Sequence, residues 1–182
     1  PTAADLVRDL TERELADIFH RYGEEPAARK VAAAIARARA EAPIVTTGRL
    51  ADLVVSVKGR RGRLHPATTV FQALRIAVNG ELESIQTVLP QALSLLRPGG
   101  RLAVIAFHSL EDRIVKRFMH EEAQVCRCPA TQPICTCDRQ PALRLLDRHA
   151  TQATPTEAAA NRRSRGARLR AAERLCYPVQ GG

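Results

Sequence analysis

Three observations predict an α/β fold with a helical lobe. Residues 65–118 show the pattern helix, tight turn, apolar strand, helix, which is the order of elements in an open α/β sheet. Residues 1–60 have helical periodicity, and residues 166–175 alternate apolar residues with arginine, as expected of a late strand. We therefore expect a helical lobe at 1–62 and a sheet-containing part at 63–182.

The stretch from His65 to Phe118 has the strongest pattern. Pro98–Gly100 should end a long helix and turn the chain, and Pro90 is expected to kink or break that helix earlier. Leu102–Phe107 is a nearly continuous apolar run, as expected of a strand covered on both faces in a parallel sheet. The long helix presents one apolar seam at steps of three and four, formed by Phe71, Leu74, Val78, Leu82, Ile85 and Leu89.

The first 60 residues predict three short helices. Thr11 and Glu14 form a capping-box signature, and Gly23 is suited to stop the helix that they begin. A second helix is expected over 26–40, and Thr46 or Thr47 should cap a third. Two of these helices also fit a helix-turn-helix that binds duplex DNA, but that interpretation leaves the polar motif at 107–113 without a role.

The charge balance favours a nucleic-acid partner. Lys and Arg total 28 against 19 Asp and Glu, giving a net charge of +9, although a generally basic protein remains the alternative. No apolar run approaches the roughly 18 residues of a membrane span, and no secretory signal opens the chain. We expect a cytoplasmic location and no membrane partner. Two basic segments, 58–63 and 162–165, are candidates to hold an RNA backbone, and the first is equally well explained as a solvated linker. Their basic residues are Lys58, Arg60, Arg61, Arg63, Arg162, Arg163 and Arg165.

Polar residues follow the predicted strand at the position where open α/β sheets bind ligands. His108 is placed for substrate contact there, while Ser109, three residues before Asp112, is expected to cap the next helix. Glu111 and Asp112 are the residue types that favour a helix N-terminus. Asp112 and Lys116 are spaced to form an ion pair along that helix. The long helix also carries an amide-rich stripe, which is explained either as a solvated face or as a surface that holds a base edge: Gln72, Arg75, Asn79, Glu83 and Gln86.

Four of the five cysteines lie in the loop-like segment 121–140, ahead of an expected edge strand within 141–149. They form two C-x-C pairs, Cys126 with Cys128 and Cys135 with Cys137. Four thiolates in twelve residues predict a tetrahedral zinc site, but these pairs are tighter than the usual C-x2-C. Reduced thiols are the alternative, because disulfides are disfavoured in the cytoplasm.

Four ordered blocks give a family resemblance. LADIFHRYGEE, HPAT-x-x-FQALRI-x-VN-x-EL, L-x-PGGRL-x-VI-x-FHSLEDR-x-VK-x-F and N-x-RSR-x-ARLRAAER occur in the order found in one family. The chain resembles the bacterial 16S rRNA (cytosine-N4)-methyltransferases of the MraW or RsmH type, over nearly its whole length. No G-x-G-x-x-G follows a strand and no P-loop is present.

The resemblance implies a partial class I (Rossmann-like) methyltransferase sheet with an inserted helical lobe. It implies S-adenosylmethionine as methyl donor and N4-methylcytidine in the decoding centre of 16S rRNA as product. The inserted lobe at 1–62 would help to recognise substrate, and 63–182 would be the C-terminal half of the catalytic domain. The family's cofactor-binding motifs precede Pro1, so the resemblance assigns neither a cofactor-binding nor a catalytic residue here.

The resemblance also implies a set of substrate contacts and partners. The expected partner is 16S rRNA or the small ribosomal subunit, with a homodimer as a further expectation. Without the donor half, this chain alone also fits a non-catalytic basic RNA-binding module. The residues carried over for substrate contact are His65, Thr68, Gln72, Arg75, Asn79, Phe107, His108, Ser109, Glu111 and Arg113.

Overall fold

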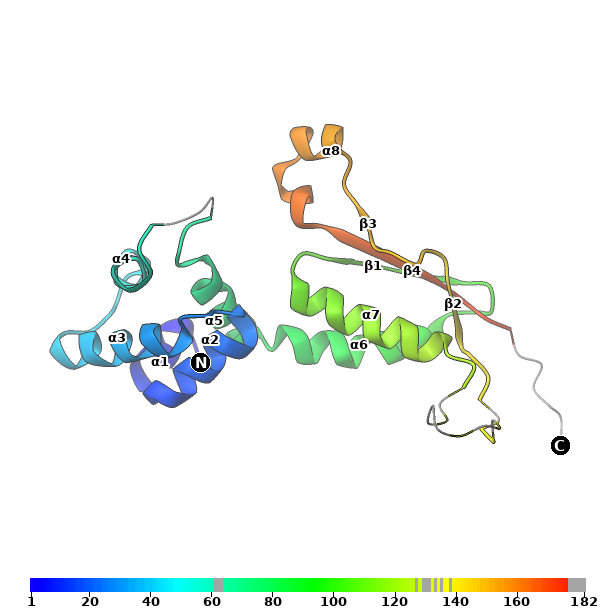
Figure 1. Ribbon diagram of the computed structural model, residues 1–182, viewed down its shortest axis with the longest axis horizontal. Helices are drawn as coiled ribbons and strands as arrows, with labels where there is room; N and C mark the ends of the chain where they lie inside the picture. The colour runs from blue at the N-terminus through cyan, green and yellow to red at the C-terminus, as the bar shows by residue number, and fades with distance from the viewer. Residues whose placement is uncertain are drawn as a thin grey trace. The chain divides into compact units, whose positions relative to one another are not determined.

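A computed structural model describes residues 1–60, 64–126, 128, 132, 134, 136–137 and 139–176. The chain forms two compact units, Pro1–Glu81 and Leu82–Gly182 (Figure 1), each with its own apolar core. Three predicted site residues, Arg61, Arg63 and Cys135, lie outside the described residues. Within the described part, no helix is both long and apolar enough to cross a membrane.

The first unit is helical. Its elements are α1 (Ala3–Asp9), α2 (Glu12–Gly23), α3 (Ala28–Glu41), α4 (Thr47–Lys58) and α5 (Thr68–Asn79). Thr11 and Glu14 form the predicted capping box at the start of α2, and Thr46 caps α4 by accepting the N–H of Arg49. The local cap predictions are thus confirmed. The largest fully buried side chains of this core include Leu15, Phe19, Val31, Ile35, Val54 and Leu74.

Gly23 has a different role from the expected one. It is the last residue of α2, and the left-handed turn that ends the helix is made by Glu24, at φ 48°. A Cβ at Gly23 would lie 2.6 Å from the carbonyl oxygen of Thr69, at the start of α5. The glycine therefore permits α2 and α5 to approach closely rather than supplying the turn.

The predicted long helix is two helices. Helix α5 ends at Gly80, a left-handed residue at φ 59°, and α6 (Glu81–Leu95) follows and continues through Pro90. The single apolar seam is therefore wrong, because Leu74 belongs to the first core and Leu89 to the second. Packing of the flanking α6 side chains on the second core keeps the turn at Pro90 helical. Because α5 packs in the first core, the compact units meet at 81/82, whereas the sequence placed the division at 62/63.

The second unit is an open sheet with helices on one face. Strands β1 (Arg101–Ala106), β4 (Arg168–Arg174) and β2 (Leu143–Leu145) lie in that order, and β3 (Thr151–Gln152) also pairs with β4. Helix α6 and helix α7 (Ser109–Ala123) lie beside this sheet (Figure 1) and share its core. Helix α8 (Pro155–Ala160) and the 3-10 helix η1 (Arg162–Gly166) precede β4. The expected α/β class and the late strand at 166–175 are confirmed.

The expectation for β1 is wrong in two respects. The strand pairs antiparallel with β4, not in a parallel sheet, with Leu102 opposite Ala172. Only one of its faces is covered: Leu102 and Ala106 are buried, whereas Ile105 is 57% exposed and Phe107, directly after the strand, is 60% exposed. Helices α6 and α7 pack on the even-numbered side chains, and within this chain the odd-numbered side chains remain open.

Candidate functional site

The junction between β1 and α7 is held by a reciprocal cap. His108, not Ser109, is the N-cap of α7, and its Nδ1 accepts the N–H of Glu111 at 3.3 Å. The Glu111 carboxylate reaches back and accepts the N–H groups of Phe107 at 2.7 Å and His108 at 3.2 Å. Because Nδ1 is the acceptor, the neutral ring carries its proton on Nε2. That atom has no hydrogen-bond partner among the described residues and lies 3.4 Å from a Glu111 oxygen.

Asp112 connects the first turn of α7 to β4. Its buried carboxylate accepts hydrogen bonds from Arg170 Nε at 2.6 Å, Arg170 Nη2 at 3.1 Å and Arg168 Nη1 at 3.1 Å. The hydrogen bond from Arg170 is the main cause that holds the pKa of Asp112 below its ordinary value, against the opposing effect of burial. The predicted pair with Lys116 is therefore wrong, because partners 56 and 58 residues away occupy the carboxylate.

Exposed arginines lie next to this junction. The end of β1 pairs with the beginning of β4, with Ala106 opposite Arg168, so η1 lies at the same end of the sheet as Phe107. A Cβ at Gly166, the last residue of η1, would lie 3.2 Å from the Phe107 carbonyl oxygen. The turn is anchored by buried Ser164, which donates to the Asn161 carbonyl oxygen at 2.8 Å. The predicted RNA-backbone residues on this turn are all exposed: Arg162, Arg163 and Arg165.

The structure therefore gathers one part of the predicted site within the second unit. The side chains that it brings to one end of the sheet come from the β1–α7 junction and from η1. Arg113, the fifth residue of α7, is also exposed. An exposed aromatic ring and several guanidinium groups at one end of the sheet form a surface suited to an unpaired nucleotide and its phosphates.

The other predicted substrate residues belong to the first unit, where they make internal contacts. The Gln72 amide donates to the Tyr22 carbonyl oxygen at 3.3 Å, which ties α5 to the end of α2. Arg75 forms a bidentate pair with Glu81 at 2.8 and 2.9 Å, and Asn79 donates to the same carboxylate at 3.0 Å. This part of the amide-rich stripe thus shapes the end of α5.

The His65-Pro66-Ala67-Thr68 motif forms the start of α5. The His65 carbonyl oxygen accepts the Thr68 N–H at 3.0 Å and the Thr68 hydroxyl at 2.7 Å. His65 Nδ1 accepts the N–H of Ala67 at 3.2 Å, while the Ala67 side chain is fully buried. The motif fixes the first turn and leaves His65 and Thr68 exposed.

A buried ion pair joins Lys58, the last residue of α4, to Glu25, which precedes α3. Glu25 is 1% exposed; its carboxylate accepts hydrogen bonds from Lys58 Nζ at 2.5 Å, the Thr69 hydroxyl and the N–H of Ala27 at 2.9 Å. Burial raises the pKa of Glu25, but the hydrogen bonds from Lys58, Thr69 and Ala27 outweigh it and leave the pKa below its ordinary value. Lys58 also donates to the Pro66 carbonyl oxygen at 2.7 Å. The structure thus gives Lys58 internal partners in place of the expected phosphate, whereas Arg60 is exposed.

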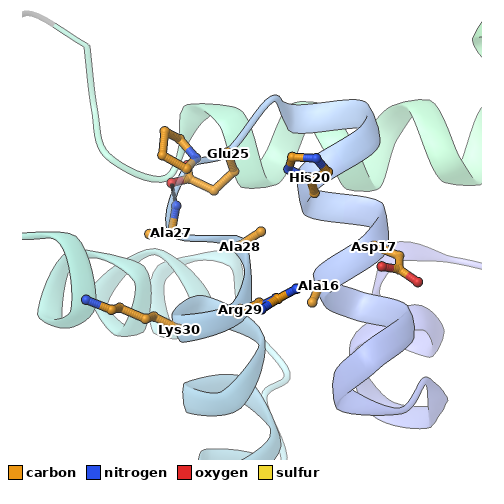
Figure 2. A pocket seen from close by; sticks show the side chains of 9 residues that line it. Ala16, Asp17, His20, Glu25, Ala27, Ala28, Arg29 and Lys30 are labelled. Atoms are coloured by element: carbon orange, nitrogen blue, oxygen red, sulfur yellow. Dashed lines mark hydrogen bonds between the residues drawn. The ribbon is translucent and has the colours of Figure 1, made fainter.

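A surface pocket of about 620 Å³ borders this ion pair, between α2 and α3 (Figure 2). Figure 2 shows Asp17 and His20 on α2, with Arg29 and Lys30 on α3. None of the predicted site residues lines this pocket.

The cysteine loop brings three of its thiols together. The Sγ atoms of Cys126, Cys128 and Cys137 all lie within 4.8 Å of one another, and none of these residues is in a disulfide. Hydrogen bonds from the Thr136 backbone N–H and then from the Cys126 thiol lower the pKa of the Cys128 thiol. Cys135, the fourth predicted ligand, lies outside the described residues.

Comparison with known proteins identifies the family. The model of the MraW methylase family matches residues 1–175. The chain belongs to the MraW methylase family. It is 55% identical over 176 residues to a ribosomal RNA small subunit methyltransferase H from Thermomicrobium roseum, covering 96% of this chain and 54% of that protein. Proteins of the same name from Syntrophotalea carbinolica and Dehalococcoides mccartyi are 54% and 50% identical, with 56% and 51% of their lengths covered. The chain thus spans about half the length of these relatives.

Sequence reasoning missed the two buried carboxylates of this MraW-family chain. Glu25 is separated from Lys58 by 33 residues and from Thr69 by 44. Asp112 has a local partner at the correct helical spacing, which conceals its distant arginine partners. Local spacing holds no signal for either pair, because each forms only when separate elements pack together.

Proposed function

We propose that the full-length protein transfers a methyl group from S-adenosylmethionine to N4 of a cytidine in the decoding centre of 16S rRNA. The family match over residues 1–175 carries this proposal, together with relatives named as small-subunit ribosomal RNA methyltransferases. In this assignment the first unit helps to recognise RNA, and the second unit supplies the substrate side of the catalytic domain.

The turn between β1 and α7 does not offer a binding site for the methyl donor. The strand-to-helix turn at the end of β1 contains no glycine, and its Phe107 and His108 N–H groups already bond to the Glu111 carboxylate. These are the groups that would otherwise be available to an anionic ligand at a helix start. We therefore assign the donor site to the part of the longer relatives that this chain does not span.

The chain's own residues are proposed to position the base. The exocyclic amine of cytosine is a weak nucleophile, because its lone pair is delocalised into the ring, and orientation is the main help that it needs. The base must leave its stack or come from an open RNA segment. The exposed Phe107 ring offers a face for stacking, which typically contributes about 1–3 kcal/mol per base. The His108 ring is buried beneath this position, where its Nδ1 caps α7 and supports the turn that carries Phe107.

The proposal predicts which nucleoside is made. Full-length protein is incubated with labelled S-adenosylmethionine and small subunits that lack the modification, and the digested 16S rRNA is analysed by mass spectrometry. We expect N4-methylcytidine at one decoding-centre cytidine. A different methylated nucleoside, or label in 23S rRNA alone, would contradict the proposal.

Phe107→Ala, compared with Ile105→Ala, tests the stacking role. Within this chain both side chains are more than half exposed, but Ile105 lies inside the paired strand, whereas Phe107 follows its last paired residue. We expect Phe107→Ala to reduce methylation by about 10-fold, since loss of a stacked base costs about 1–3 kcal/mol. Ile105→Ala should leave methylation of correctly folded protein near the wild-type rate. Equal effects of the two changes would remove the stacking role.

A second candidate function, a non-catalytic RNA-binding module, is favoured for this chain alone by its exposed arginines and by the turn after β1, whose N–H groups are bonded to Glu111. Calorimetry of the chain with S-adenosylmethionine should show no binding, whereas an RNA titration should show binding that weakens with salt. Replacing Arg162, Arg163 and Arg165 with Ala should reduce the salt slope by about 2, at about 0.7 per single-strand phosphate contact. An unchanged slope would exclude these arginines from the RNA contact.

A further inference from the structure

The cysteine loop is closed at its base by an arginine. Helix α7 ends at Ala123, and Arg139 returns to its last turn. The Arg139 guanidinium donates to the Glu121 carbonyl oxygen at 2.5 Å and the Gln124 carbonyl oxygen at 3.0 Å, and it lies 3.6 Å from the Glu122 carboxylate. These bonds hold the two ends of the loop together, and Cys137 lies close to Cys126 and Cys128.

The spacing of the thiols matches a tetrahedral metal site. Four sulfurs at a Zn–S distance of about 2.3 Å lie about 3.8 Å from one another. Cys126 Sγ and Cys137 Sγ are 3.6 Å apart, and Cys128 Sγ lies within 4.8 Å of both. A disulfide requires about 2.05 Å. The thiols are thus at the separation of ligands that share an ion, not of a covalent pair.

The local backbone also supports negative charge on sulfur. The N–H of Cys128 donates to Cys126 Sγ at 3.3 Å, a bond that strengthens when the sulfur is a thiolate. Soft sulfur donors select zinc, copper(I) or iron over magnesium or calcium, and four-coordinate thiolate sites in small loops most often hold structural zinc. None of the substrate-contact residues belongs to this loop.

We propose that Cys126, Cys128 and Cys137 bind one structural Zn²⁺ ion that clamps the loop between α7 and β2. Cys135, which its sequence spacing predicted as the fourth ligand, lies outside the described residues. Because the loop joins two elements of the second core, the ion stabilises that unit and takes no part in methyl transfer. Its binding adds to folding stability, since the unfolded chain does not hold the thiols in this arrangement.

Zinc content tests the proposal directly. The chain is purified with reductant from zinc-supplemented cells, dialysed, and analysed by plasma mass spectrometry. We expect about one zinc per chain, reduced at least 10-fold in Cys126→Ser and in Cys137→Ser. Cys176→Ser is the matched control: this exposed cysteine lies outside the cluster, and its variant should retain the metal. Zinc that survives both cluster substitutions would overturn the proposal, as would a zinc-free wild-type chain that takes up no added Zn²⁺.

A second measurement avoids variants that fail to fold. The wild-type chain is stripped with a chelator, checked for retained helix by circular dichroism, and titrated with Co²⁺ as a spectroscopic substitute for zinc. Thiolate ligation should produce an intense near-ultraviolet charge-transfer band that saturates at about one equivalent and is lost when Zn²⁺ is added. Absence of that band, with the thiols kept reduced throughout, would refute the site.

Discussion

The contact between Asp112 and Arg170 should be a main stabilising contact between α7 and β4. The test compares Arg170→Ala with Arg168→Ala, two changes of the same kind in neighbouring residues of one strand that share a single carboxylate. Arg170 donates two hydrogen bonds to Asp112, and Arg168 donates one. The two side chains differ mainly in burial, which makes them a matched pair.

The structure sets the expected sizes of the two effects. The Asp112 side chain is 8% exposed and that of Arg170 is 13% exposed, so truncating Arg170 leaves a buried carboxylate with one weaker partner. Breaking a buried ion pair from one side costs about 3–5 kcal/mol. The Arg168 side chain is 44% exposed, and an exposed pair contributes about 1 kcal/mol or less. The expected ratio of the two losses is therefore at least about threefold.

Urea unfolding monitored by hydrogen exchange measures these losses of stability in the second unit. Amides of α7 and β4 report on the second unit, so separate unfolding of the two units does not confuse the result. A circular-dichroism helix signal alone would combine the unfolding of the two units. If Arg168→Ala costs as much as Arg170→Ala, or if both cost under 1 kcal/mol, the ion pair does not hold α7 to the sheet.

Two further predictions concern the helical unit. Gly23→Ala should destabilise this unit by about 1–3 kcal/mol in urea unfolding, because the new methyl group would meet the Thr69 carbonyl oxygen. The control is Gly48→Ala, at a helical position with open space, which should be neutral or stabilising by up to about 1 kcal/mol. Equal changes in the free energy of unfolding for the two variants would contradict the close approach of α2 and α5. The lowered pKa of Glu25 means that its carboxylate stabilises the folded chain above the ordinary pKa of about 4.3, and that this contribution is lost as the pH falls through the lower folded pKa. Glu25→Gln should lower the free energy of unfolding at pH 7 by about 3 kcal/mol, since Lys58 loses its charged partner. It should also reduce the loss of stability that the wild-type chain shows as the pH falls. Parallel stability–pH curves for wild type and variant would rule out the Glu25–Lys58 pair as the cause of that loss.

Local chemistry determines the features that the sequence predicted well. The Thr11–Glu14 box and the Thr46 cap depend on residues within one turn, and both form as expected. The cap of α7 was predicted one residue late. Ser109 is the stronger capping type, but the exit of β1 leaves His108 in extended geometry and its backbone N–H beside the Glu111 carboxylate. The register of a cap next to a strand is thus decided by the strand.

Features that depend on distant packing escaped prediction. A continuous apolar pattern from α5 into α6 does not reveal that Gly80 takes a left-handed conformation and sends the two halves into different cores. The cysteine loop lies between the features predicted from local sequence and those that depend on distant packing. Its spacing indicates metal ligation without establishing that the thiols meet, and the three described thiols do meet because Arg139 closes the loop.

The open face of β1 connects the prediction that failed with the proposed function. An apolar run with no alternation is typical of a strand covered on both sides, yet Ile105 lies exposed in a chain about half as long as its relatives. In the proposed full-length enzyme, further chain covers this face, and the run then has the burial that its composition predicts. Phe107 differs from Ile105 because it lies past the last paired residue of β1, beside the Gly166 turn and its arginines. Its ring can therefore stay open to a base at the strand end even where the strand itself is covered, which is the arrangement that the methyl-transfer proposal requires.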